Sequence, residues 1–155
     1  MGEQMVQIVN KAFVELILER FKHCLCGDRF SVILRDKNRH FIYKHSLNRS
    51  QIRDTLCQLK VEDYWQSEPS KVVIDGIVHK FFMQATLTNF AGETRITTLH
   101  VKFELIKLSE SEKTALIESG KLSSDEEDVD RTAIISFHEA EQPAEYAFHQ
   151  EVIIC

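Results

Sequence analysis

The chain has 155 residues, of which 43% are hydrophobic and 9% aromatic, and these values are typical of one globular domain with a single core. No apolar run approaches the roughly 20 residues that a membrane span requires, and the start lacks the basic region of a signal peptide, so we expect a soluble, cytoplasmic protein in which residues 1–155 form one domain. The net charge of −5 argues against simple nucleic-acid binding.

The charge is unevenly distributed along the chain. Residues 109–131 contain eight acidic and three basic side chains, so this segment holds the whole acidic excess, and we expect an exposed acidic insertion there. Residues 29–60 contain eight basic and two acidic side chains. This compact basic region is available to contact phosphate.

The first third of the chain predicts helices. Apolar residues recur at helical spacing over residues 5–21, and Gly27 ends that helix. Residues 29–35 predict a short strand, and residues 36–39 predict a charged turn. A second helix is predicted over residues 46–59, with Asn48 or Ser50 as its N-cap.

The rest of the chain changes to the two-residue period of strands. Residues 71–74 and 77–88 flank an Asp-Gly turn and predict a hairpin, and residues 94–107 predict a second long strand. Ser109 and Glu112 have capping-box spacing, which indicates a short helix before a last strand over residues 131–138. The order predicts an α+β domain whose antiparallel sheet has helices packed on one face.

The four cysteines do not have the spacing of a metal site. Cys24 and Cys26 are separated by one residue where zinc sites use two to four, and no second pair follows. We interpret all four as reduced thiols and expect neither a metal nor a cofactor.

Alternation assigns the side chains of the long strands to two faces. Odd positions of residues 99–105 are apolar, and in the last strand Ala133, Ile135 and Phe137 point the same way as one another. If the helices cover the apolar face, the open face collects Lys80, Gln84, His100, Lys102, Ser136 and His138. Any half-exposed sheet has a polar face, so the pattern also fits a sheet without a site.

Two short stretches resemble a known family of toxins. Residues 59–67 read Leu-Lys-Val-Glu-Asp-Tyr-Trp-Gln-Ser and are similar to the Leu-Thr-x-Glu-Asp-Phe/Tyr-Tyr-Lys-Ser segment of the motility quorum-sensing regulator (MqsR) toxins, which also follows a helix. Residues 135–139 read Ile-Ser-Phe-His-Glu and resemble the last strand of that family. With the Asp-Gly turn in the expected order between them, the resemblance covers roughly residues 48–143.

The resemblance implies a RelE-like fold that cuts mRNA on the open face of its sheet. It also implies a type II toxin that a cognate antitoxin holds inactive, so RNA and an antitoxin protein are the expected partners. The chemistry needs no metal. A base takes the ribose 2′-OH proton, the oxygen attacks the adjacent phosphate, cations stabilise the developing charge, and an acid protonates the leaving oxygen.

The functional positions of that family, taken in chain order, fall on Gln66, Phe82, Gln84 and His138. Gln66 brings no charge and Phe82 moves no proton, so either the cations have shifted to Lys80, Lys102 or Arg95, or much of the activity has been lost. Among the matched positions only His138 carries an imidazole, the side chain that exchanges protons near neutral pH.

The leading interpretation makes Lys80, Lys102 and His138 catalytic. The expected substrate-binding residues are Tyr64, Gln66, Phe82, Gln84, Arg95 and His100. The alternative is a catalytically silent protein- or nucleic-acid-binding module of RelE-like fold whose acidic loop docks a partner. His138 separates the two: facing Lys102 and His100 across the sheet, it favours the enzyme, whereas burial against Phe137 with its nitrogens bonded to the backbone favours the module.

Overall fold

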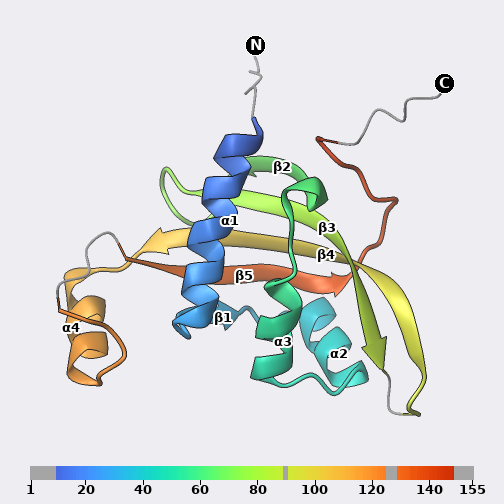
Figure 1. Cartoon of the computed structure of the whole chain (residues 1–155), viewed down its shortest axis with the longest axis horizontal. Coiled ribbons are helices and arrows are strands. Elements are labelled where there is room, and N and C mark those ends of the chain that lie inside the picture. Colours follow the sequence, from blue (N-terminus) through green and yellow to red (C-terminus); the bar gives the residue numbers. More distant parts are fainter. Residues whose placement is uncertain (1–9, 89–90, 125–128, 149–155) are drawn as a thin grey trace.

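The computed structural model describes residues 10–88, 91–124 and 129–148, which form an α+β fold. The helices are α1 (Lys11–Cys26), α2 (Asp36–Lys44), α3 (Arg49–Leu56) and α4 (Glu110–Glu118), with a 3₁₀ turn η1 (Val61–Asp63). The strands are β1 (Phe30–Val32), β2 (Tyr64–Pro69), β3 (Ile77–Thr88), β4 (Thr94–Lys107) and β5 (Asp130–Glu139). They lie in the order β1-β5-β4-β3-β2 (Figure 1). No helix within the described ranges is long and apolar enough to cross a membrane.

Capping residues set the ends of the helices, and Gly27 and Asn48 do so as predicted, whereas Asn10 was predicted to lie inside the first helix. Asn10 accepts from the Phe13 N–H at 2.9 Å at the start of α1, and the Gly27 N–H donates to the His23 carbonyl at its end. Asn48, one of the two predicted caps, forms a capping box with Gln51 at the start of α3. The predicted residues 5–9 of the first helix lie outside the described residues.

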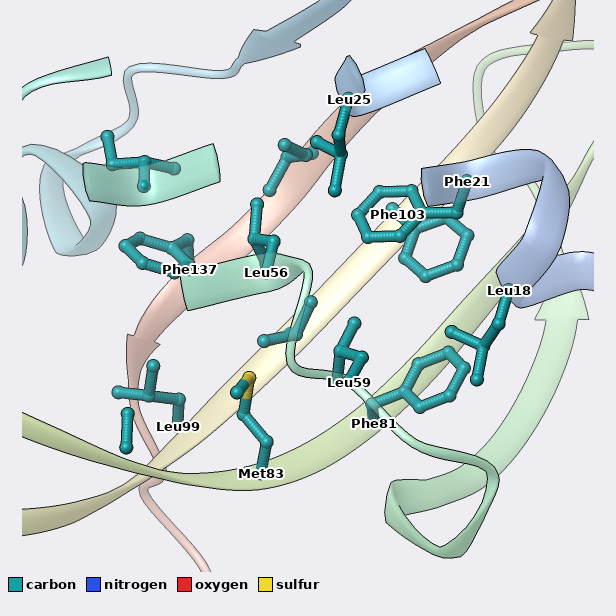
Figure 2. Close-up of a cluster of buried hydrophobic side chains, with 14 of the residues drawn as sticks. Leu18, Phe21, Leu25, Leu56, Leu59, Phe81, Met83, Leu99, Phe103 and Phe137 are labelled. Carbon is teal, nitrogen blue, oxygen red and sulfur yellow. The ribbon is translucent and has the colours of Figure 1, made fainter. Parts of the chain in front are cut away.

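The core lies between the sheet and the helices α1 and α3, which cover one face (Figures 1 and 2). Phe21 of α1 stacks on Phe103 of β4 with ring centroids 3.8 Å apart, and Phe103 stacks on Phe81 of β3 at 5.5 Å. Each fully buried ring contributes about 1.5–3 kcal/mol to stability. The prediction that helices cover the apolar face is therefore confirmed.

The sheet is mixed, which corrects the prediction of a purely antiparallel sheet. The three long strands β3, β4 and β5 pair antiparallel, as predicted. At the edge, however, β1 pairs parallel with β5, with Phe30 opposite Thr132. A three-residue strand carries no periodicity that could show its direction or its partner.

Two predicted elements have other structures. Residues 36–39 begin the helix α2 rather than a charged turn. The partner of β3 is β2 and not residues 71–74, since Ser70 Oγ accepts from the N–H groups of Val72 and Val73 and turns the chain there. The polar side chains of residues 64–69 alternate poorly with apolar ones, which hid this strand.

A β-bulge in β5 changes the predicted faces of the last strand. Lys102 pairs with Ser136 but the next residue of β4 pairs with Ile134, so Ile135 is the extra residue. Ile134 and Phe137 are fully buried in the core, while Ala133 and Ile135 are only partly buried. The assignment of Ala133 and Ile135 to the core face together with Phe137 was therefore wrong.

The side chain of Asn38 in α2 is fully buried and forms hydrogen bonds with the backbone of the bulge. Its amide nitrogen donates to the carbonyls of Ile33, at 2.7 Å, and Ile135, at 2.9 Å. Its side-chain oxygen accepts from the Phe137 N–H at 2.9 Å. One side chain thus satisfies backbone groups that the bulge removes from the ladder, and it fixes α2 beside the C-terminal half of β5.

The acidic insertion is partly exposed and partly anchored. α4 begins at the predicted Ser109–Glu112 capping box and buries no residue. Asp130 is buried at the start of β5, where it accepts from Arg20 Nη2 at 2.9 Å, so the prediction of exposure was wrong at that end. Residues 125–128 of the predicted loop lie outside the described residues.

Candidate functional site

Cross-strand register arranges the polar residues of the open face in two neighbouring rows. The first row, here called the cationic row, consists of Gln66, Lys80, Lys102 and Ser136 from four consecutive strands. The second row, here called the aromatic row, consists of Trp65, Phe82, His100 and His138. Residues from β2 to β5 that are far apart in the sequence therefore meet on one surface.

The two lysines of the cationic row have different surroundings. Lys80 Nζ lies 2.6 Å from Glu68 Oε1 and 5.0 Å from the centroid of the Trp65 ring. Lys102 Nζ makes no hydrogen bond or ion pair with any residue that the structure describes. Burial, and then the charge of Lys80, lowers the pKa of Lys102. Lys102 is thus a cation that can meet an anionic ligand and that gives up its proton more readily than an ordinary lysine.

The aromatic row is a continuous line of rings. Ring centroids lie 5.1 Å apart between Trp65 and Phe82, 5.3 Å between Phe82 and His100, and 5.6 Å between His100 and His138. Phe82 is 1% exposed, so Trp65 and His100 are the rings of this row that reach solvent most. Burial, followed by the charges of His138, Lys102 and Lys80, lowers the pKa of His100 to about 4, so that ring is neutral at pH 7.

His138 lies at the end of the aromatic row, opposite His100 and diagonal to Lys102. The ring nitrogen Nδ1 lies 2.9 Å from the carbonyl oxygen of Glu139. Because a carbonyl only accepts, Nδ1 carries the proton, and Nε2 of the neutral ring has its lone pair available. The residue is 9% exposed. His138 therefore combines the position expected of an enzyme with the backbone bond and the burial expected of a binding module.

The structure places six of the nine predicted site residues together with access to the open face, namely Gln66, Lys80, Gln84, His100, Lys102 and His138. Phe82 shares the face but lies beneath Trp65. Tyr64 is buried among the helices and Arg95 points to the helix side, where it meets Glu139 at 3.4 Å, so neither belongs to this surface.

Trp65 and Glu68 belong to the surface and were missed. A bulge lies between Tyr64 and Gln66, so Tyr64 pairs with Phe81 on the core side while Gln66 faces outward. Strict alternation would place Tyr64 on the open face with Gln66 and would turn Trp65 toward the core. The extra residue reverses this, so Tyr64 lies in the core and Trp65 on the open face. Glu68 could have been found only by identifying β2 as a strand.

Tyr64 takes part in a buried polar chain on the helix side instead. Its hydroxyl lies 2.7 Å from Ser67 Oγ, which in turn lies 2.7 Å from His79 Nδ1. His79 is 3% exposed and its ring lies beside Phe13 and Phe103. Burial, and then the charge of Arg20, lowers the pKa of His79 to about 4.

We expect this histidine to make the protein less stable in acid. Below pH 6.5, the ordinary pKa of histidine, residue 79 of the unfolded chain binds a proton that the folded chain accepts only near pH 4. The free energy of unfolding therefore decreases as the pH falls from about 6.5 to 4. Between pH 7 and pH 5 the expected loss is about 2 kcal/mol for this residue. Urea unfolding of the wild type and of His79→Gln at both pH values measures it. An equal pH dependence in the two proteins would contradict the prediction.

No family model, curated protein or solved structure matches the chain. The fold and this surface define an α+β domain whose open sheet face carries adjacent cationic and aromatic rows. Such a face suits a ligand that has both phosphate groups and planar rings.

Proposed function

We propose that the chain is a metal-independent endoribonuclease with a RelE-like fold, acting on mRNA as a toxin of the MqsR type. The observation that carries the proposal is the position of His138, which lies on the same face as Lys102 and Lys80 and uses Nδ1, not Nε2, for its bond to the backbone. The two stretches that carry the resemblance also converge there, since one supplies Trp65 and Gln66 and the other supplies Ser136 and His138. A cognate antitoxin is part of this proposal as the partner that covers the face.

The residues suggest a division of roles in the reaction. His138 Nε2 takes the proton from the ribose 2′-OH, and the oxygen attacks the adjacent phosphorus. Lys80 and Lys102 stabilise the charge on the phosphorane oxygens. Lys102, with its lowered pKa, donates a proton to the departing 5′ oxygen. The products are a 2′,3′-cyclic phosphate and a 5′-hydroxyl.

The test is an incubation of purified full-length protein with end-labelled single-stranded RNA in the presence of EDTA. We expect cleavage of the RNA and none of an oligonucleotide in which every ribose is replaced by deoxyribose. Failure to cut any of a varied panel of RNA sequences, by protein that is folded and free of partner, would overturn the proposal.

A second function is favoured by the burial of His138 and by the ion pair that occupies Lys80. In that case the face binds single-stranded nucleic acid without cutting it, using Trp65 and His100 as stacking surfaces and Lys102 as a phosphate contact. The same incubation separates the two functions, because a silent module shifts the RNA in a native gel while leaving it intact.

Both functions predict that Trp65 contacts a base. It is the single tryptophan of the chain, so intrinsic fluorescence reports on this position alone. We expect a deoxy-substituted oligonucleotide to quench the emission of the wild type. Measured by the anisotropy of a labelled oligonucleotide, Trp65→Ala should bind about tenfold more weakly, because stacking on one base contributes about 1–3 kcal/mol. Trp65→Phe, which keeps a ring, should retain part of the affinity. Equal affinity of the wild type and Trp65→Ala would show that the base lies elsewhere.

A further inference from the structure

A pocket lies immediately beyond His138, between α2 and the end of β5. Its volume is about 240 Å³. The lining residues are Lys37, His40, Phe41, Lys44, His138, Glu139, Ala140 and Glu141. His138 thus belongs to two places at once, since it ends the aromatic row and also forms one wall of this pocket.

The basic side of the pocket comes from one side of α2. Lys37, His40 and Lys44 are spaced three and four residues apart, so they lie along one stripe of the helix. The buried hydrogen bonds of Asn38 hold α2 against β5 at this level. The stripe of basic side chains is therefore held at a fixed position relative to His138.

A carboxylate already occupies the basic end of the pocket. Glu141 Oε1 lies 2.6 Å from Lys37 Nζ. The hydrogen bond from Lys37 is the largest cause of the lowered pKa of Glu141, and His138 and His100 act on it in the same direction. The two side chains are 60% and 59% exposed, and an ion pair this exposed is weak, so another anion can replace the carboxylate at little cost.

We propose that this pocket is a phosphate subsite for the RNA backbone next to the cleavage site, and that Glu141 holds the place of the phosphate until RNA displaces it. The inference rests on the proposed function for the identity of its ligand. Lysine contacts to phosphate supply much of the affinity of such complexes without reading the sequence. The subsite therefore gives the RNA strand a path from Trp65 across the sheet to α2.

The test compares charge changes in the pocket with the same changes elsewhere. The pair Lys113 and Glu110 on α4, with Nζ and Oε2 3.7 Å apart, provides matched controls that alter the net charge equally. Affinity for a deoxy-substituted, non-cleavable oligonucleotide is measured by fluorescence anisotropy at several salt concentrations. We expect Lys37→Ala to weaken binding about tenfold and to lower the salt slope by about 0.7, and Glu141→Gln to tighten binding several-fold. Lys113→Ala and Glu110→Gln should each change the affinity less than about twofold.

The subsite is overturned if Lys37→Ala behaves like Lys113→Ala, or if Glu141→Gln binds no more tightly than Glu110→Gln. Cleavage of all-ribose RNA by the wild type is measured in parallel. If the wild type cleaves RNA but Lys37→Ala and Glu141→Gln bind like their controls, the nuclease proposal is supported and the subsite proposal is wrong. Shifted affinities without cleavage support the subsite and contradict the nuclease. If the wild type neither binds the oligonucleotide nor cleaves RNA, both proposals are wrong, and cleavage without binding contradicts the subsite alone.

Discussion

We expect His138→Ala to cleave RNA more slowly than the wild type by about a hundredfold or more, the usual effect of losing a general base. The imidazole is oriented by the bond between Nδ1 and the Glu139 carbonyl, and it lies diagonal to Lys102 on the open face. Initial rates on one labelled RNA in EDTA, under single-turnover conditions, measure the effect.

Two further variants separate chemistry from folding. His138→Gln keeps a side chain of similar length with an N–H donor but cannot take up a proton, so it should be as slow as His138→Ala. His23→Ala removes an exposed histidine from the last turn of α1 and should cleave like the wild type. Urea unfolding confirms that each variant is folded. A His138→Gln variant with the wild-type rate would exclude this residue as the base.

The second large effect concerns Asn38, whose replacement by Ala should lower the free energy of unfolding by about 3 kcal/mol, because it leaves several buried backbone groups without partners. Urea denaturation at neutral pH measures the change. Asn48→Ala is the matched control, since that asparagine caps α3 at the surface and its loss costs about 1 kcal/mol. A loss for Asn38→Ala no greater than for Asn48→Ala would mean that water replaces the three bonds.

Asn38 also supports the candidate site, because its hydrogen bonds to the backbone of Ile135 and Phe137 hold the segment of β5 that carries Ser136 and His138. The bulge at Ile135 lets Phe137 remain in the core while Ser136 and His138 face outward. The His138 imidazole, one residue before the end of β5, completes a row of rings that begins at Trp65.

Much of the fold follows from local chemistry that a single sequence displays. The caps at Asn48 and Ser109 and the stop at Gly27 were predictable because a side-chain oxygen or a glycine must satisfy the open end of a helix. The faces of β3 and β4 followed from strict alternation, which places Lys102 and His100 outward. Alternation also puts Arg95 on the same side as Leu99, which is the helix side of the sheet. The prediction that Arg95 is a cation of the open face therefore conflicted with the alternation from which the two faces were assigned.

The remaining errors arise where an extra residue or a tertiary contact overrides the local pattern. A bulge carries no reliable sign in one sequence, and the two bulges here reversed the roles of Tyr64 and Trp65 and moved Ala133 off the core side. The distant partners of Asn38, which hold α2 against β5, are not revealed by any neighbouring residue in the sequence. The pocket beside it could be seen only once α2 and β5 were placed side by side.

The most direct test of the proposed chemistry is the mass of the RNA ends produced by the wild-type protein in EDTA. Attack by the 2′ oxygen predicts a 5′ fragment that ends in a 2′,3′-cyclic phosphate, one water lighter than the linear phosphate, together with a 3′ fragment that begins with a 5′-hydroxyl. Mass spectrometry of a short synthetic RNA after brief incubation distinguishes these ends. Intact RNA, or fragments with a 3′-hydroxyl and a 5′-phosphate, would contradict cleavage by His138 and the lysines of the cationic row.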